Sequence, residues 1–339
     1  MSPNRSSVRK VPRGRSLSRR EFLALSSSIG AQWALISAIG SRPTRGATLP
    51  KIVADEAWAR IEQLGDAVWA VVSTPLAKND WTTLSNGGII ASRDRVVTVE
   101  GYAKPAGAKW VAERARELTG RWPTDVVVTH YHGDHANGLE GYGTEDERPQ
   151  VWLTAKTLDL IRKDDIRREY PSRSVRAEML DAARILDPEK STALDLGGLT
   201  ITLHPRRGHT ASDVTIELEE PSVVFFGDLL WNRLFPNYRD TIPTAFSQSI
   251  RAALRDRETA YVPGHGPRPE AGELEAYLSL VDEIEAFGRR SFEKGVSPAE
   301  AAADFKLPRS VSDWHLFNDS YFEVALRAWH KELEETKGE

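Results

Sequence analysis

The stretch THYHGDH occupies residues 129–135 and holds three of the eight histidines of the chain. It continues the run DVVVT at 125–129, whose β-branched composition is typical of a short buried strand. Three histidines and one aspartate within six residues cannot all point one way along a helix or strand, but they can converge on a loop that leaves a strand. Imidazole suits zinc well, and a neighbouring carboxylate adds charge for a second ion. The stretch therefore predicts a metal site at a strand end.

The chain contains no cysteine, which excludes disulfides, thiolate zinc sites and cysteine nucleophiles. Any metal must therefore be held by His, Asp and Glu. Three further candidates follow predicted strands and lie next to glycine, namely His209 in GHT, Asp228 in FFGD and His265 in PGHG. Glycine lets a backbone turn sharply and approach a site closely. Each candidate is a weak signal alone, but together they repeat the strand-end arrangement of the first stretch.

Taken in chain order, these seven residues resemble the ligand series of the metallo-β-lactamase-fold hydrolases. The series is His130, His132, Asp134, His135, His209, Asp228 and His265. The resemblance covers about residues 60–268 and is closest to the glyoxalase-II-like type with two metals. It implies an α/β fold, a four-layer αββα sandwich, with the site at one edge between two sheets. We expect this catalytic domain to occupy residues 55–268.

The resemblance also implies how the ligands are divided. Two zinc ions per chain are expected, each held by three residues and joined by a shared aspartate, with iron or manganese as other candidates. The first set is His130, His132 and His209, the second is Asp134, His135 and His265, and the bridge is Asp228. Zinc lowers the pKa of bound water to about 7, so the metals would share a hydroxide that attacks the substrate. Asp134 is also the expected catalytic residue, because it would orient this nucleophile.

Four more residues are expected around the metals. Glu100 stands where the family's pattern usually has Asp, and we expect it to orient a ligand histidine. Trp81 precedes a region that forms a flap over the site in relatives, and Trp231 and Asn232 follow Asp228. We expect these three to bind substrate, since aromatic side chains near a site often hold its apolar part and an amide can contact a carbonyl.

The resemblance implies a hydrolase that cleaves an ester, thioester, lactone or similar acyl bond of a small molecule. A β-lactamase that hydrolyses β-lactam antibiotics is an alternative, because an exported enzyme would meet them. Antibiotic-cleaving relatives use Cys, or a polar residue that does not bridge, at the position of Asp228, and the Cys-type enzymes have Lys at the position of Trp231, which counts against this alternative. An iron-dependent redox protein on the same fold is the other alternative. Its oxygen-reducing members usually carry Glu in place of His132, so hydrolysis is favoured.

The first 46 residues have the character of an export signal. They hold nine of the 45 Lys and Arg residues and one of the 49 acidic residues, and SRREFL at 18–23 leads into an uncharged stretch over 22–40. This pattern resembles a twin-arginine signal, so we expect a periplasmic or otherwise exported protein that meets the export machinery. Serine and glutamine make this stretch less apolar than a typical membrane anchor, so an export signal is favoured over an anchor. Membrane association is expected only if the signal is not cleaved.

The rest of the chain is acidic, with 36 Lys and Arg against 48 Asp and Glu, a net charge of −12. Nucleic acid is therefore a poor partner, because phosphate contacts need clustered basic residues, and a small-molecule substrate is expected. Runs rich in Val and Ile predict strands over 68–73, 88–92, 95–100, 125–129, 199–203, 214–218 and 223–226, and a further short strand is predicted to end at Tyr261 and Val262. Apolar spacing predicts helices over 106–118, 155–162, 175–185, 246–254, 274–287, 298–305 and 321–333. Residues 269–339 are thus expected to form a helical C-terminal extension.

Overall fold

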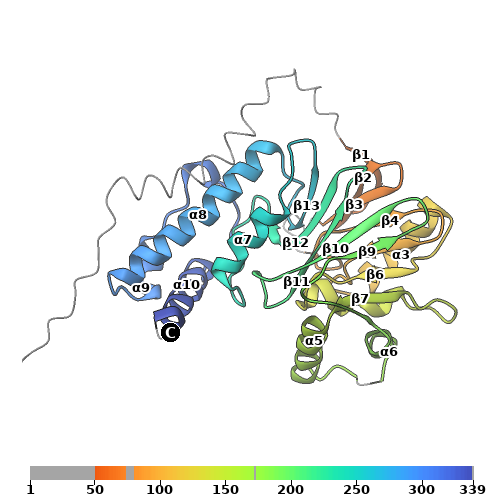
Figure 1. Cartoon of the computed structure of the whole chain (residues 1–339), viewed down its shortest axis with the longest axis horizontal. Coiled ribbons are helices and arrows are strands. Elements are labelled where there is room, and N and C mark those ends of the chain that lie inside the picture. Colours follow the sequence, from red (N-terminus) through yellow and green to blue (C-terminus); the bar gives the residue numbers. More distant parts are fainter. Residues whose placement is uncertain (1–49, 74–79, 172, 338–339) are drawn as a thin grey trace, which may run out of the picture. The chain divides into compact units, whose positions relative to one another are not determined.

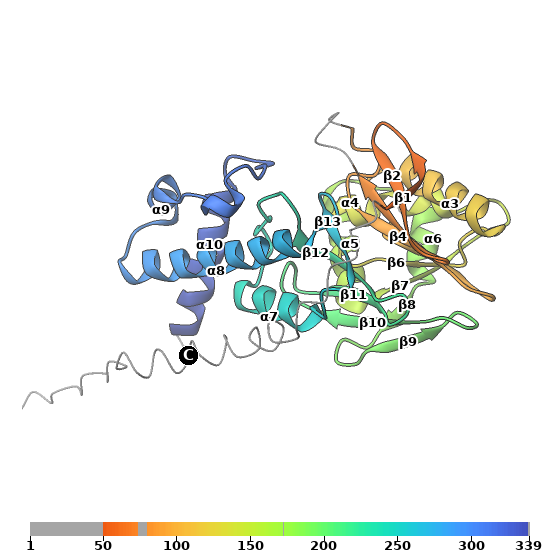
Figure 2. The ribbon, with the colours of Figure 1, turned by 90° about the horizontal axis from the view of Figure 1, so that it is seen from above.

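Two β-sheets packed face to face form the centre of the structure (Figures 1 and 2). The computed structural model describes residues 50–73, 80–171 and 173–337, so the predicted export signal over 1–46 lies outside them. The larger sheet has the order β1 (Lys51–Asp55), β2 (Ala59–Gly65), β3 (Val68–Ser73), β4 (Gly87–Ala91), β5 (Val96–Val99), β6 (Asp125–Val127), β7 (Gln150–Thr154) and β8 (Arg184–Leu186). The smaller sheet has the order β13 (Ala260–His265), β12 (Val223–Trp231), β11 (Asp213–Leu218), β10 (Thr200–Arg206) and β9 (Thr192–Asp195).

Helices cover the outer face of each sheet. Those that follow strands of the larger sheet are α3 (Pro105–Thr119), α4 (Gly133–Ala136), η1 (Asn137–Tyr142), α5 (Ala155–Arg167) and α6 (Val175–Asp181). Those that follow strands of the smaller sheet are α7 (Pro243–Ala253), α8 (Ala271–Glu293), α9 (Pro298–Asp304), η2 (Arg309–Val311) and α10 (Tyr321–Lys337). The result is an α/β fold of four layers with further helices at its C-terminal end.

The alternation of side chains along β3 shows why the layers form. Val68, Ala70 and Val72 belong to the core between the two sheets, together with residues of β10–β12. Trp69 and Val71, which point to the opposite face, pack in the core beneath α3, α5 and α6. A strand with apolar residues on both faces is stable only when both faces are covered, so β3 must pack against the smaller sheet on one side and against helices on the other.

The C-terminal helices pack against one another and against the smaller sheet. Helix α8 begins at Ala271 with a capping box in which Glu270 and Glu273 satisfy each other's backbone amides. The Tyr277 hydroxyl of α8 donates a hydrogen bond of 3.1 Å to the carbonyl of Leu229 in β12. Figures 1 and 2 show α8 running from the side of β13 past α7, with α9 at its far end and α10 packed against it. The described residues from Pro50 onward form a single compact unit.

One predicted helix is wrong at its C-terminal end. The helix expected over 175–185 ends at Asp181, and Arg184–Leu186 forms strand β8 instead. This strand pairs in parallel with β7, with Trp152 opposite Arg184 and Thr154 opposite Leu186. Backbone pairing with a neighbouring strand therefore overrides the local helical spacing. Strands β1, β2, β7 and β9 were not predicted, because their short or charged sequences carry little periodic signal.

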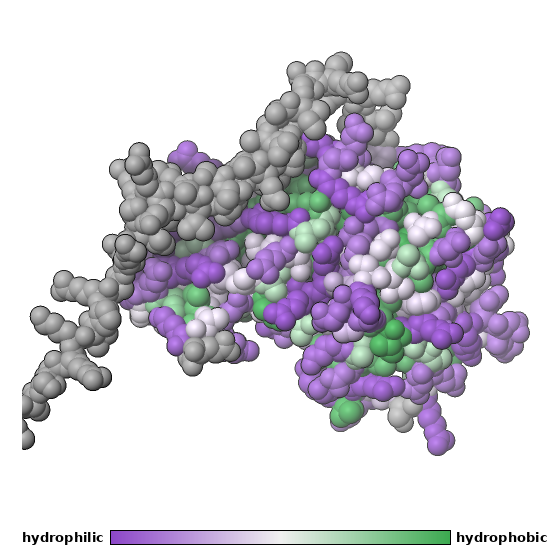
Figure 3. Space-filling view, in the orientation of Figure 1, coloured by the Kyte–Doolittle hydropathy of each residue, from purple (hydrophilic) through white to green (hydrophobic). Residues whose placement is uncertain are grey.

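The described surface is mainly hydrophilic on the face shown in Figure 3, with small scattered apolar patches. Among the residues that the structure describes, no helix has both the length and the apolar character needed to cross a membrane.

Candidate metal centre

Seven side chains from both sheets converge at one edge of the sandwich. They form two groups whose possible ligand atoms lie within 4.8 Å of one another in each group. The first group is His130, His132, His209 and Asp228, and the second is Asp134, His135 and His265. In the larger sheet, the parallel pairing of β5 with β6 puts Glu100 and the residues after β6 at one sheet edge. In the smaller sheet, parallel pairing puts Asp228 of β12 beside the end of β13, and the packing of the two sheets brings the two sets together.

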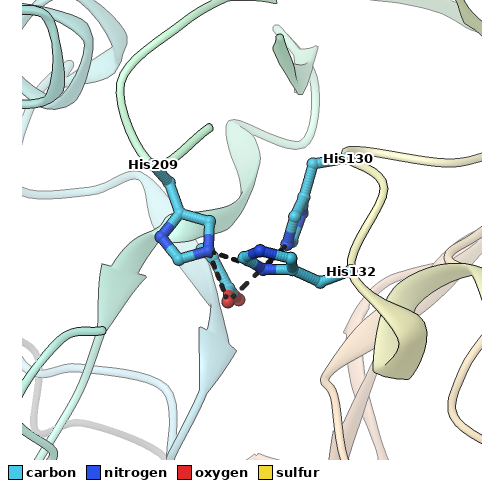
Figure 4. A group of neighbouring side chains, drawn as sticks. His130, His132 and His209 are labelled. Atoms are coloured by element: carbon cyan, nitrogen blue, oxygen red, sulfur yellow. Dashed lines mark hydrogen bonds and ion pairs between the residues drawn. The ribbon is translucent and has the colours of Figure 1, made fainter. Parts of the chain in front are cut away.

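In the first group, three imidazoles face one another (Figure 4). His132 Nδ1 lies 3.1 Å from His130 Nε2 and 3.0 Å from His209 Nε2. One Asp228 oxygen, Oδ2, lies 3.2 Å from His209 Nε2 and 3.7 Å from His130 Nε2. Three ring nitrogens and a carboxylate oxygen aimed at one point leave room for a cation as their common partner.

The second group shares the same carboxylate. Asp228 Oδ1 lies 3.1 Å from His135 Nε2 and 3.3 Å from His265 Nε2. Asp134 Oδ2 lies 3.2 Å from the same His265 nitrogen. Asp228 therefore turns one oxygen to each group. Its Oδ1 and the His135 Nε2 are buried, and neither has a hydrogen-bond partner among the described residues.

Two glycines make this convergence possible. Gly227 has a φ of 52°, and a side chain there would meet Thr129 Oγ1 at 2.7 Å. A Cβ at Gly264 would lie 2.0 Å from the Asp228 carboxylate. Only glycine fits both positions, so β12 can approach the loop of His130 and β13 can lie directly beside Asp228.

The electrostatics of the buried cluster favour a cation. Burial and the neighbouring His135 lower the pKa of His130 well below its usual range, which leaves its imidazole neutral. Burial alone would raise the pKa of Asp228, but His265, His135 and His209 hold it well below the usual range. Burial also opposes protonation of His265, yet Asp228 and Asp134 raise its pKa to about 9. The carboxylates thus stay ionised and attract positive charge, supplied by protons when no metal is bound.

Glu100 lies directly behind the second group. It follows β5, the parallel neighbour of β6, and its side chain is 1% exposed. Its Oε1 lies 3.0 Å from His135 Nδ1. The backbone amide and the hydroxyl of Thr129 donate to it at 3.2 and 2.6 Å, and the same hydroxyl lies 2.9 Å from His130 Nδ1. One carboxylate thus contacts His135 directly and His130 through Thr129.

The structure adds a residue that the sequence analysis missed. Asp240, in the loop between β12 and α7, places Oδ2 3.0 Å from His132 Nε2 and accepts a 2.8 Å hydrogen bond from the Tyr131 hydroxyl. The contact holds His132 with Nδ1 turned to the other ligands. Asp240 has no glycine neighbour and no strand-end position, so no sequence signal marks it.

A pocket of about 700 Å³ opens above the two groups, and Asp134, Asp228 and His265 lie in its floor. Trp81 lines this pocket and is 55% exposed. Trp231 also lines it, but the side chain is 3% exposed, with its ring 4.2 Å from that of His265. Trp231 therefore packs on a ligand candidate and also faces the pocket.

The expectation that Asn232 binds substrate is wrong. Its side chain is fully buried and is not part of the pocket lining. The amide donates to the carbonyl of Pro267 at 3.0 Å and to Glu273 Oε2 at 3.1 Å. Side chains alternate along an extended chain, so the residue after Trp231 points away from the pocket and ties β12 to the start of α8.

The C-terminal extension contributes to the pocket, which the sequence did not indicate. Phe317 and Tyr321 line it, and the Phe317 ring lies 5.9 Å from that of Trp231. Backbone hydrogen bonds of 3.0 Å join Phe235 N to the His315 carbonyl and His315 N to the Arg233 carbonyl. They fix the segment before α10 against the loop after β12.

Comparison with known proteins finds a matching family model and distant relatives. The model of the metallo-beta-lactamase superfamily matches residues 99–265. The chain is 25% identical over 255 residues to the metallo-beta-lactamase type 2 of Bacillus cereus, covering 73% of this chain and 92% of that protein. It is 26% identical over 235 residues to the hydroxyacylglutathione hydrolase of Methylobacterium nodulans, covering 64% of this chain and 84% of that protein.

Solved structures show the same fold. The sec-alkylsulfatase Pisa1 from Pseudomonas sp. superposes with a TM-score of 0.61 at 16% identity, over 80% of this chain and 49% of that one. A metallo beta lactamase from Erythrobacter litoralis superposes with a TM-score of 0.53 at 20% identity, over 69% of this chain and 100% of that one. The chain thus has the metallo-beta-lactamase fold. Its residues 99–265, which include the converging histidines and aspartates, match the metallo-beta-lactamase superfamily.

Proposed function

We propose that this protein is a metal-dependent hydrolase that cleaves an ester, thioester, lactone or similar acyl bond of a small molecule. The observation that carries the proposal is the convergence of two donor groups on Asp228 at the floor of a pocket. A shared carboxylate between two sets of imidazoles is the arrangement that a pair of divalent ions requires.

The donor set fits two zinc ions, with iron or manganese as the other candidates. It offers imidazole nitrogens and carboxylate oxygens, and the buried Asp228 Oδ1 and His135 Nε2 make no hydrogen bond of good geometry among the described residues. His130, His132 and His209 would hold one ion, Asp134, His135 and His265 the other, and Asp228 both. Zinc supplies Lewis acidity and a water whose pKa is lowered to about 7.

The protein's own side chains supply orientation. Asp134 has 22% of its side chain exposed and lines the pocket, so its carboxylate can accept a hydrogen bond from an attacking water and orient it. Trp231 and Phe317 cover the side of the pocket next to His265 and exclude bulk water there. Trp81 offers an exposed aromatic face to the apolar part of a substrate.

The similarity to the Bacillus cereus metallo-beta-lactamase type 2 supports β-lactam hydrolysis as a second candidate. The family resemblance implies Cys, or a polar residue that does not bridge, at the position of Asp228 in such enzymes, and Lys at the position of Trp231 in the Cys type. Asp228 and Trp231 therefore support cleavage of an ester, thioester or lactone instead. The two readings differ in the bond that is cleaved, so a substrate panel separates them.

The test is metal content by mass spectrometry together with turnover of five probes. They are a nitrophenyl ester, a thioester, a lactone, bis-nitrophenyl phosphate and a chromogenic cephalosporin. About two zincs per chain and chelator-sensitive turnover of the ester, thioester or lactone are expected. Turnover of the cephalosporin alone would select the second candidate. Iron without any turnover would move the protein to redox chemistry.

We also propose that the enzyme acts outside the cytoplasm, on the basis of the twin-arginine pattern within residues 1–46. Replacement of Arg19 and Arg20 by Lys should retain the protein in the cytoplasm. Cell fractionation with an antibody measures this, and unchanged export would contradict the proposal.

A further inference from the structure

The lining of the pocket has a cationic part and an aromatic part. Lys163, Arg167 and Arg168, from α5 and the residue after it, line the cationic part, and Arg239 joins them from the loop after β12. All four side chains are exposed at the mouth of the pocket. The proposed chemistry at the metal centre uses none of them.

This cationic part has an excess of positive charge. Arg167 and Arg168 share a single carboxylate, that of Asp164, and Lys163 lies 2.9 Å from Asp159. Among the described residues, no carboxylate lies within ion-pair distance of Arg239. Asp134 and Asp228 lie in the pocket floor, so the other acid near these cations is Asp240, whose carboxylate is engaged by His132 and Tyr131. In the cationic part of the lining, two carboxylates, those of Asp164 and Asp240, therefore face four cations, in a chain that is otherwise acidic.

The other part of the lining is aromatic and lies on the side of His265. Trp231 and Phe317 have ring centroids 4.2 and 6.1 Å from that of His265. Tyr321 continues this part, and the C-terminal extension supplies both it and Phe317. Arg167 lies instead on the side of His132, since Tyr131 and Asp240, which interact with Arg167 electrostatically in addition to Asp164, flank that histidine. Arg239 lies near enough to Tyr321 for its charge to act on that hydroxyl, so it stands where the cationic and aromatic parts meet.

We propose that the substrate is an amphiphilic anion that spans the two donor groups. Its apolar portion packs against Trp231, Phe317 and Tyr321, and its carboxylate or other anionic group lies against the cationic residues of α5 and Arg239. This inference rests on the proposed acyl-bond hydrolysis and narrows its substrate class. The scissile bond then lies between the two portions, above Asp228.

The physical effect of the cations is attraction of the anionic group. Exposed ion pairs are individually weak, but several charges of one sign around a cleft raise the local concentration of an anion and orient it. The attraction should fall with added salt, because the charges lie in solvent. Packing against the aromatic part should not depend on salt.

Direct binding of two probes, one anionic and one neutral, tests the inference. The anionic probe is 6-(dansylamino)hexanoate and the neutral probe is its N-methylamide, which differs only at the carboxylate. Fluorescence titration of the metal-loaded protein measures both dissociation constants. We expect the anionic probe to bind about fivefold more tightly than the neutral one, and the difference to disappear in 0.5 M salt.

Variants assign the effect to the named residues. The double variant Arg167→Gln/Arg168→Gln and the single variant Arg239→Gln should each weaken only the anionic probe, the double variant by about fivefold. The matched control Lys156→Gln/Arg162→Gln changes two exposed cations of α5 that do not line the pocket, and it should leave both probes unchanged. Phe317→Ala should weaken both probes alike.

Equal affinity for the two probes in the wild type, or no measurable binding of either, overturns the inference. So does a preference for the anionic probe that survives the variants but is lost with the metal, because the carboxylate would then bind at the metal centre. Turnover of the five hydrolysis probes is recorded on the same samples. Charge preference without turnover would overturn only the proposed function, and turnover without charge preference would overturn only this inference.

Discussion

His132 Nε2 lies 3.0 Å from Asp240 Oδ2, although the two residues are 108 positions apart in the chain. The contact fixes the ring so that Nδ1 faces His130 and His209. It joins the loop after β6 in one sheet to the loop after β12 in the other. The orientation of a ligand candidate therefore depends on the packing of the two sheets.

Asp240→Asn should lower metal affinity about 10–100-fold, because residues that orient a ligand histidine typically contribute that much. Folding should be retained, since the Asp240 side chain is 37% exposed. Competition with a chromogenic chelator measures the affinity. Asp159→Asn, an exposed acid on α5, is the control, and equal affinity in the two variants would contradict the role of Asp240.

His132→Ala should abolish turnover and lower metal content. It removes a nitrogen that lies about 3 Å from two other ligand candidates, so the first group loses one of its four donors. We expect a fall in kcat/KM of at least about 100-fold, more than for a residue that only orients a ligand. His204→Ala, in β10 and outside both the donor groups and the pocket lining, serves as the control. Full activity of His132→Ala would remove the basis for the assignment.

Asp228→Asn should affect the two metal positions unequally. The carboxylate turns Oδ2 to His209 and Oδ1 to His135 and His265, whereas an amide offers one oxygen only. One ion should therefore be lost at a lower chelator concentration than the other. Metal analysis during stepwise chelation measures this, and simultaneous loss of both ions would argue against a shared ligand.

Glu100→Gln should lower the free energy of unfolding by about 1–3 kcal/mol, the cost of leaving a buried polar group unpaired. Both carboxylate oxygens accept hydrogen bonds from Thr129, and the amide nitrogen of glutamine would face one of these donors. Denaturant unfolding of the metal-free protein measures the change. Metal affinity should also fall, because Glu100 lies 3.0 Å from His135 Nδ1. A variant with unchanged stability and affinity would show that its carboxylate has no positioning role.

Trp231→Phe should raise KM about fivefold and leave metal content unchanged. The indole packs 5.9 Å from the Phe317 ring and lines the pocket, and an aromatic pair of this kind contributes about 0.5–1.5 kcal/mol. Phenylalanine keeps the apolar packing on His265, so a large cavity is avoided. The measurement is steady-state kinetics on the nitrophenyl ester with parallel metal analysis. Loss of metal would show that Trp231 acts by holding His265.

The sequence by itself indicated the fold class and the ligand candidates. Two local patterns were enough to indicate the ligand candidates without knowledge of the packing. One is THYHGDH after a Val-rich strand, and the other is the placement of His209, Asp228 and His265 beside glycines. Glu100 also follows a predicted strand. Within each sheet, the parallel pairs β5–β6 and β12–β13 put strand-end residues at one edge. The packing of the two sheets against each other then brings these residues and His209 together.

Only the tertiary structure decided the remainder of the site. Asp240, Phe317 and Tyr321 reach the pocket from segments far along the chain that carry no local signal. Asn232, adjacent in sequence to a pocket residue, points away from the pocket because side chains alternate along a strand. Local sequence governs which backbone conformations are favourable. Contacts between distant segments depend on how the two sheets and the C-terminal helices bury their apolar faces together.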